Sequence, residues 1–175
     1  LNDMVPDIGK QVVIVGGSAT GCETARLVAS LGVPDPDTFT FLLYHSADGF
    51  DRLRKLLYST GRKITVIDIL ERMASNVGPS TRWSLMKSLR LMGVEFRPRT
   101  KLVEISTDSV IVDTEQGKES IPADTVIIAV GSQSVDYLAQ EVKWNRTQVI
   151  TIGDAKEPRK ITDAVRDGFD TALNI

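Results

Sequence analysis

The sequence predicts an α/β fold with a central parallel sheet, and three observations support this prediction. Uncharged runs rich in β-branched residues occur at residues 12–15, 64–67 and 125–130, and such runs are typical of strands buried on both faces. The first run passes straight into a glycine-rich turn. Apolar residues at helical spacing separate the first run from the second. A strand, a glycine turn and a helix in this order predict a Rossmann-like nucleotide-binding unit.

The glycine turn begins at Gly16 and reads Gly-Gly-Ser-Ala-Thr-Gly, with serine in place of the middle glycine of the G-x-G-x-x-G pattern. Gly16 permits a sharp turn, and Gly21 lets the following helix pack close to the strand. The small residues Gly17 and Ser18 let the backbone approach a ligand. Free N–H groups at the start of the helix, near Ala19, would then face a pyrophosphate. A tight turn that binds no ligand has the same glycines, so the motif alone does not decide between the two roles.

An acid follows the second apolar run and favours the nucleotide hypothesis. Asp68 stands at the predicted end of that strand, where a carboxylate can accept hydrogen bonds from the two hydroxyls of an adenine ribose. The usual interval between glycines and acid is about 20 residues, whereas Asp68 lies 47 residues beyond Gly21. An insertion explains the difference. We expect a helix over residues 19–31 that ends at Gly32, and then an inserted helical hairpin at residues 33–61.

Beyond the acid, the sequence predicts the rest of the sheet. A helix opens at Pro79 and ends at Gly93, with Trp83, Met86 and Leu89 facing the sheet. A short strand at residues 94–96, an antiparallel meander at 102–117 and a second central parallel strand at 124–130 follow. Gly131 ends the last of these strands and should come close to the dinucleotide.

The sequence predicts fewer helices and strands after residue 131. A polar stretch occupies residues 132–147, a strand is expected at residues 149–152, and a helix at residues 159–173. The apolar stripe Ile161, Val165 and Phe169 on that helix predicts docking against the nucleotide domain or self-association with a second copy.

The composition is that of an ordinary soluble chain with one sizeable core: its 175 residues are 42% hydrophobic and 25% charged. A formal net charge of -2, from 21 basic and 23 acidic residues, gives no electrostatic reason to expect nucleic acid or an anionic membrane as partner. No apolar run approaches the ~20 residues needed to cross a bilayer. One cysteine excludes an internal disulfide and a cysteine-based metal cage, and favours a cytoplasmic location. Because Leu1 opens the chain in place of methionine, we expect a piece of a longer polypeptide.

As a set, these motifs resemble the NAD(P)H-binding domain of the pyridine nucleotide-disulfide oxidoreductase superfamily. The matching segments are the glycine turn with the Gly-Cys-Glu-Thr-Ala that follows, and residues 66–68, 127–131 and 152–154. Residues 78–83 (Gly-Pro-Ser-Thr-Arg-Trp) and 152–160 (Ile-Gly-Asp-Ala-Lys-Glu-Pro-Arg-Lys) also resemble the C-terminal region of bacterial 2-enoate reductases, 2,4-dienoyl-CoA reductases and trimethylamine dehydrogenase. The resemblance covers nearly the whole chain except the inserted hairpin.

In that family, a β/α barrel with FMN and an iron–sulfur cluster precedes two nucleotide-binding domains, one for FAD and, inserted within it, one for NAD(P)H. The resemblance implies that residues 1–145 form the NAD(P)H-binding domain, and that residues 146–175 are a strand and helix returning to an FAD-binding domain otherwise absent. The barrel and the FAD domain of the same polypeptide would be its partners. The resemblance also implies that hydride passes from nicotinamide to FAD in an enzyme like the enoate and dienoyl-CoA reductases, and that this piece alone is inactive and contains no catalytic residue.

Several site residues come from the resemblance. It places Glu23 close to the nicotinamide and the flavin, and Gly131 against the dinucleotide. Gly153 and Asp154 match a pair whose carboxylate hydrogen-bonds the ribityl chain of the flavin. From the residues alone, Glu23 also fits a solvated acid in a first helical turn, and Asp154 fits a turn residue. Arg72, one turn beyond the ribose acid, is a further cofactor-binding candidate.

Asp68 predicts a preference for NAD(H) over NADP(H), because a fixed carboxylate accepts from a 2′-OH and repels a 2′-phosphate. Arg72 could weaken this preference. Three other residues are given structural roles: Cys22 as a small buried side chain, His45 as a histidine without a catalytic partner, and Trp83 as part of the core.

Two other functions use some of the same features. A free-standing dinucleotide-binding or redox-sensing module would use the glycine turn and Asp68, but would have no use for the Gly-Asp pair at residues 153–154. An S-adenosylmethionine methyltransferase also combines a glycine turn with an acid. The meander and the apolar strand ending at Gly131 argue against the methyltransferase.

Overall fold

The computed structural model of the protein describes residues 7–58, 61–142 and 148–175. The chain forms two compact units, Leu1–Val130 and Gly131–Ile175. The predicted boundary at residue 145 lies outside the described residues. Among the described helices, none is both long enough and apolar enough to span a bilayer.

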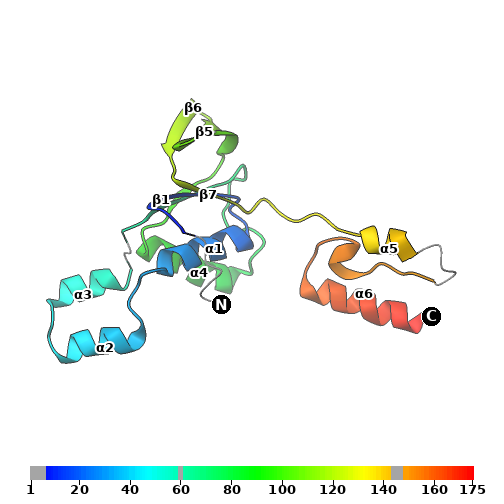
Figure 1. Cartoon of the computed structure of the whole chain (residues 1–175), viewed down its shortest axis with the longest axis horizontal. Coiled ribbons are helices and arrows are strands. Elements are labelled where there is room, and N and C mark those ends of the chain that lie inside the picture. The colour runs from blue at the N-terminus through cyan, green and yellow to red at the C-terminus, as the bar shows by residue number, and fades with distance from the viewer. Residues whose placement is uncertain (1–6, 59–60, 143–147) are drawn as a thin grey trace. The chain divides into compact units, whose positions relative to one another are not determined.

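The first unit is built around a sheet of four parallel strands in the order β3-β2-β1-β7. Of these strands, β1 and β7 are labelled in Figure 1. The strands are β1 (Gln11–Val15), β2 (Lys63–Ile67), β3 (Glu95–Arg97) and β7 (Thr125–Ile128). Val15 of β1 pairs with Ile67 of β2, so these two strands end side by side at their carboxyl ends. The predicted α/β fold with a parallel sheet is confirmed.

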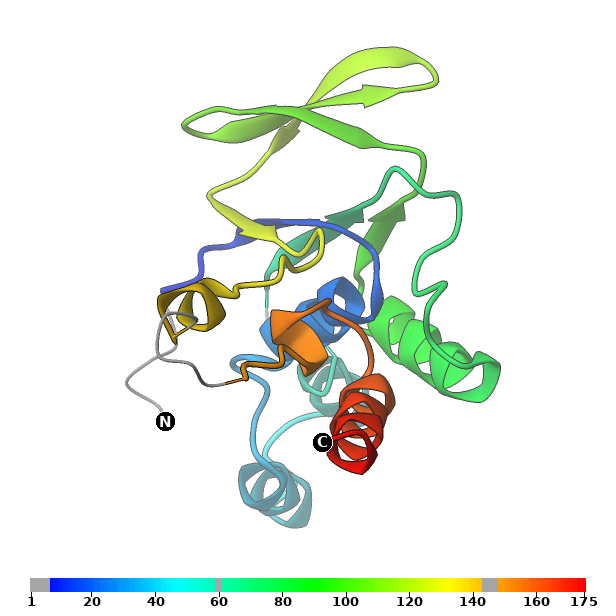
Figure 2. The same cartoon turned by 90° about the vertical axis from the view of Figure 1, so that its right-hand side faces the viewer.

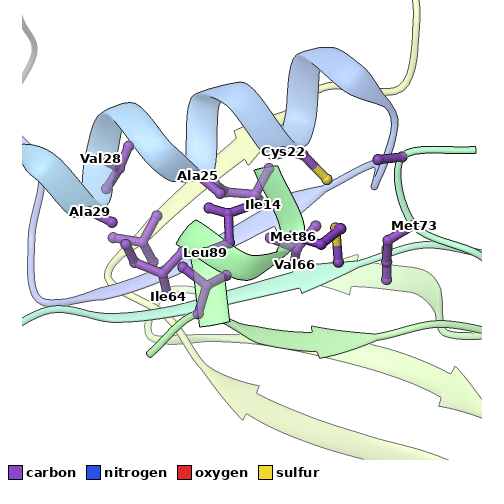
Figure 3. Close-up of a cluster of buried hydrophobic side chains, with 13 residues drawn as sticks. Ile14, Cys22, Ala25, Val28, Ala29, Ile64, Val66, Met73, Met86 and Leu89 are labelled. Carbon is purple, nitrogen blue, oxygen red and sulfur yellow. The ribbon is translucent and has the colours of Figure 1, made fainter. Parts of the chain in front are cut away.

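Two helices cover one face of this sheet, as Figure 2 shows: α1 (Ala19–Ser30) and α4 (Pro79–Leu91). The small side chains of α1, Cys22 and Ala25 among them, let the helix lie close to the strands. Figure 3 shows Val28 of α1 and Leu89 of α4 in one cluster with Ile14 of β1. This packing fixes where α1 begins, and therefore the position of the turn before it.

The antiparallel meander covers the other face of the sheet. It consists of β4 (Lys101–Ile105), β5 (Ser109–Thr114) and β6 (Gly117–Pro122). Val110 and Val112 of β5 are fully buried, and they share a second core cluster with Val13 and Ile67 of the parallel sheet. The predicted meander is thus confirmed as the cover of this face.

The predicted insertion between α1 and β2 forms two helices, α2 (Pro36–Tyr44) and α3 (Phe50–Leu56). Asp35 starts the first of them, because its side chain accepts hydrogen bonds from the N–H groups of Asp37 and Thr38. Leu53 is the buried residue of this hairpin, whereas Phe41, Tyr44 and Phe50 are exposed. The helical hairpin was therefore predicted correctly, but several of its large apolar side chains face solvent.

Two predictions for the first unit were wrong. The strand at residues 124–130 was expected to be central, but β7 pairs with β1 alone and has no described strand on its other side. The strand is apolar because both of its faces are packed. Val126 packs against the meander, and Ile127 packs on the side of the sheet that α1 covers. Trp83 was expected in the core, but it is 66% exposed on the outer face of α4. Its ring lies beside the ammonium group of Lys87 instead, at 5.0 Å.

The second unit contains α5 (Tyr137–Val142), a 3-10 turn η3 (Gly153–Ala155) and α6 (Ile161–Leu173). The strand predicted at residues 149–152 is absent, because no described strand pairs with these residues and an isolated strand leaves its backbone groups unpaired. Within the stretch expected to be polar and irregular, α5 forms a short helix instead. The final helix begins two residues later than predicted.

Candidate nucleotide-binding site

The turn after β1 is a place where only glycine fits. Gly16 has φ +108°, and a Cβ built on it would lie 2.3 Å from the carbonyl oxygen of Ala129. A Cβ on Gly21 would lie 1.8 Å from the carbonyl oxygen of Gly16. At Gly17 an added Cβ would meet the sulfur of Met73 at 2.1 Å. The three glycines therefore allow strand, turn and helix to approach more closely than any side chain would permit.

The start of α1 presents backbone N–H groups at this turn. Ser18 is the N-cap residue, and its side chain makes no capping hydrogen bond. The N–H of Ala19 donates to Oδ1 of Asn76 at 2.9 Å. Among the described residues, nothing accepts a hydrogen bond from the N–H groups of Thr20 and Gly21. These donors at the positive end of the helix dipole fit an anionic group such as a pyrophosphate.

Asp68 joins the end of β2 to the glycine turn. Its Oδ2 accepts a hydrogen bond from the N–H of Gly17 at 2.5 Å, and its Oδ1 accepts one from the N–H of Leu70 at 2.7 Å. The side chain is half-buried. A carboxylate has about four lone-pair sites, so acceptor capacity remains for ribose hydroxyls. The sequence placed Asp68 and the glycines in one site although 47 residues separate Asp68 from Gly21, and the structure brings them into direct contact.

Glu23 and Arg72 have looser positions. Glu23 lies exposed on α1, one turn beyond the glycine turn, and Arg72 lies exposed in the loop that follows β2. Neither forms a salt bridge with another described residue. Both remain candidates for contact with a bound molecule.

Three predicted site residues belong to the second unit. Gly131 has φ +117° and Gly153 has φ +60°, so both adopt backbone conformations that favour glycine. The N–H of Gly153 donates to Oδ2 of Asp167 at 3.2 Å, and Arg159 pairs with the same carboxylate. Asp154 is exposed in the first turn of η3. This network holds the Gly-Asp turn against α6 and leaves the Asp154 carboxylate open to solvent.

Sequence reasoning gave no role in the site to Met73, Ala74 and Asn76, which lie in the loop that follows Asp68. Ala74 has φ +51° and donates its N–H to the carbonyl oxygen of Gly17 at 2.6 Å. Met73 is buried against the same turn, and Asn76 holds the first N–H of α1. An asparagine shortly before a helix was the one available signal, and it more often indicates a cap of the following helix.

The cysteine and histidine have the structural roles expected of them. Cys22 is fully buried, its thiol donates weakly to the carbonyl oxygen of Gly17 at 3.5 Å, and burial raises its pKa. The thiol therefore stays protonated at neutral pH and is a poor nucleophile. His45 packs its ring beside Phe41 and Tyr44 at the end of α2. The described residues contain no group of three or more acidic, histidine or cysteine side chains that could hold a metal ion.

Residues 2–161 match the model of the family described as pyridine nucleotide-disulphide oxidoreductase. The chain belongs to the pyridine nucleotide-disulphide oxidoreductase family. The matched residues include the glycine turn, Asp68 and the meander. The predicted superfamily is thus confirmed.

Individual relatives are consistent with this assignment. The chain is 38% identical over 165 residues to a metal reductase of Desulforamulus reducens. This match covers 94% of this chain and 25% of that protein. It is 28% identical over 171 residues to an NADH oxidase of Thermoanaerobacter brockii, covering 97% of this chain and 22% of the relative. A 2-naphthoyl-CoA reductase structure has the same fold, with a TM-score of 0.74, 23% identity, and coverage of 99% of this chain and 22% of that one. The chain thus spans about a quarter of the length of these relatives.

Proposed function

We propose that the first unit binds NADH, and that it serves a flavin-dependent oxidoreductase in which hydride passes from the nicotinamide to FAD. The observation that carries this proposal is the contact between Asp68 and the N–H of Gly17. The contact brings a carboxylate that is suited to ribose hydroxyls directly beside a turn whose free N–H groups suit a pyrophosphate. The similarity to a protein named NADH oxidase supports the same cofactor.

The residues of this chain would bind and orient the nucleotide. The N–H groups of Thr20 and Gly21 would hold the pyrophosphate, and Asp68 would hold the adenine ribose. Bound NADH supplies the hydride. Glu23 follows these donors within the same helix, α1, and by the family resemblance it would lie close to the nicotinamide.

The finer identity of the enzyme is also a proposal. The motifs at residues 78–83 and 152–160 support a reductase of enoates or dienoyl-CoA esters, with FMN and an iron–sulfur cluster elsewhere in the full protein. An iron–sulfur cluster usually needs four cysteine thiolates, and this chain has one cysteine. We therefore propose that the flavin chemistry and the substrate site lie outside these 175 residues. The location we propose is cytoplasmic.

A calorimetric titration of the chain with NADH, NADPH and S-adenosylmethionine tests the proposal. We expect NADH to bind most tightly, because the Asp68 carboxylate accepts from a 2′-OH and repels a 2′-phosphate. Tighter binding of NADPH would show that Asp68 has been given the wrong role. Binding of S-adenosylmethionine alone would support the methyltransferase instead.

The alternative, a free-standing nucleotide-binding or redox-sensing module, also predicts NADH binding. The two differ at the exposed Asp154, which has no role in such a module. Replacing Asp154 with asparagine in the full-length protein should lower its flavin content if the carboxylate contacts the flavin. Unchanged flavin content would favour the alternative.

A further inference from the structure

Arg99 occupies an unusual position next to the ribose end of the proposed site. Its φ is +52°, a left-handed conformation that is unfavourable for arginine. Its N–H donates to the carbonyl oxygen of Leu70 at 3.1 Å, in the loop that follows Asp68. The next residue, Thr100, donates its N–H to the carbonyl oxygen of Asp68 at 2.8 Å. Such outliers persist where the surrounding structure holds them, and they gather at functional sites.

Two glutamates hold the Arg99 guanidinium from opposite sides. Nη2 lies 2.6 Å from Oε1 of Glu71, in the loop after β2, and Nη1 lies 2.9 Å from Oε1 of Glu115, in the turn between β5 and β6. The hydrogen bonds that the guanidinium donates to Glu115 and Glu71 raise its pKa. All three side chains are more than half exposed, and exposed ion pairs add little to stability. Stability alone thus gives no reason for this bridge to exist at a strained residue.

Two members of the bridge, Arg99 and Glu115, also line an open groove of about 340 Å³. Arg97, Arg99, Glu115 and Glu119 line the groove, and Arg97 is itself paired with Glu95 and Glu119. Four carboxylates thus surround two guanidinium groups, so negative charge is in excess. An additional phosphate would meet repulsion here, and it would find Arg99 already engaged by two carboxylates.

We propose that the Glu71–Arg99–Glu115 bridge is a specificity device, which withholds Arg99 from a 2′-phosphate and so restricts the site to a dinucleotide with a free 2′-hydroxyl. This inference rests on the proposed nucleotide-binding function. Asp68 rejects the 2′-phosphate by its own charge, and the bridge removes a nearby cation that would otherwise attract that phosphate. Neutralising the two glutamates leaves Arg99 free to bind it.

The test is a titration of the 175-residue chain with NADH and NADPH at one fixed ionic strength. In the double variant Glu71→Gln, Glu115→Gln, the affinity for NADPH relative to NADH should rise by roughly tenfold, about 1.4 kcal/mol. The single variant Glu71→Gln should give a smaller rise in the same direction. Adding Arg99→Met to the double variant should abolish the gain. Because the glutamates are exposed, circular dichroism should show an unchanged fold.

The neighbouring bridge provides the matched control. The double variant Glu95→Gln, Glu119→Gln removes two carboxylate charges around Arg97 in the same way. It should leave the affinity for NADPH relative to NADH nearly unchanged. An equal gain in this control, or a gain that survives Arg99→Met, would overturn the assignment to Arg99. If the unaltered chain binds NADH and the Glu71 variants gain nothing, the bridge proposal fails while the proposed function stands. If no variant binds either nucleotide, both proposals fail.

Discussion

At the scale of single residues, the site depends on atoms that leave no room for a side chain. Gly16 and Gly21 are needed because an added Cβ would clash with a backbone carbonyl oxygen. At Gly17 an added Cβ would clash with the side chain of Met73. The sequence was enough to predict a tight turn at these glycines, because a buried strand runs straight into them, but the glycines alone did not show whether the turn binds a ligand. Asn76 and Arg99 could not be found in the same way, because their roles come from contacts across the fold.

Gly21→Ala should destabilise the protein by about 1–3 kcal/mol, since the added Cβ would lie 1.8 Å from a carbonyl oxygen. Denaturant unfolding measures the loss. Gly168→Ala is the control, because an added Cβ there would meet only Cδ1 of Ile152, at 3.8 Å. As an alanine in a helix interior, the control should be neutral or slightly stabilising. Equal losses in both variants would show that the close approach at Gly21 is absent in solution.

Asp124 links pH to stability. Its Oδ2 accepts hydrogen bonds from the N–H groups of Gln11 and Lys10, and these bonds lower the pKa of the carboxyl below its usual 3.8. A lowered folded-state pKa means that the contribution to stability is complete above the unfolded-state pKa, near 4. The contribution is lost as pH falls through the lower, folded-state value.

Asp124→Asn should therefore lower the thermal midpoint at pH 7 and flatten the dependence of that midpoint on pH below about 4. Melting curves of both proteins from pH 7 to pH 2.5 make the comparison. Parallel curves over this range would mean that Asp124 is not linked to folding.

At the scale of elements, the sequence predicted best where an uncharged apolar run is buried on both faces of the sheet. The strands β1 and β2 have uncharged β-branched runs, and both are internal in the sheet. The prediction of strand positions failed where the burial of a segment does not follow from its apolar composition. The run at β7 lies at an edge of the described sheet, and residues 149–152 are apolar without forming a strand. An apolar run indicates that the segment packs against other parts of the protein, but it does not specify which strand or helix it packs against.

The helix α4 offers a direct test of which face is buried. Leu89 is fully buried between the helix and the sheet, whereas Trp83, on the same helix, is 66% exposed. Leu89→Ala should cost about 2–5 kcal/mol of stability. Trp83→Ala should cost less than ~1 kcal/mol, as surface substitutions do. The reverse order in denaturant unfolding would restore the prediction that Trp83 belongs to the core.

At the scale of the whole molecule, one apolar stripe of the second unit has no cover among the described residues of that unit. Ile161, Val165, Phe169 and Leu173 of α6 are each more than 60% exposed. We propose that this stripe pairs with the same helix of a second copy, because an exposed apolar surface of this kind favours association.

Phe169→Lys should accordingly shift the chain from dimer to monomer in sedimentation at micromolar concentration. Asp170→Lys introduces the same side chain off the stripe, and should leave the association unchanged. If the unaltered chain and both variants sediment as monomers, the stripe does not mediate self-association.

The central claim is that the glycine turn and Asp68 together bind NADH, and backbone amide shifts measure this most directly. In a 15N-labelled chain, saturating NADH should shift the amide signals of Gly17, Thr20 and Gly21 most strongly, together with those next to Asp68. These are the donors that would face the pyrophosphate and the residues that would hold the ribose. A saturable shift elsewhere, with the amides of the glycine turn unmoved, would contradict the account.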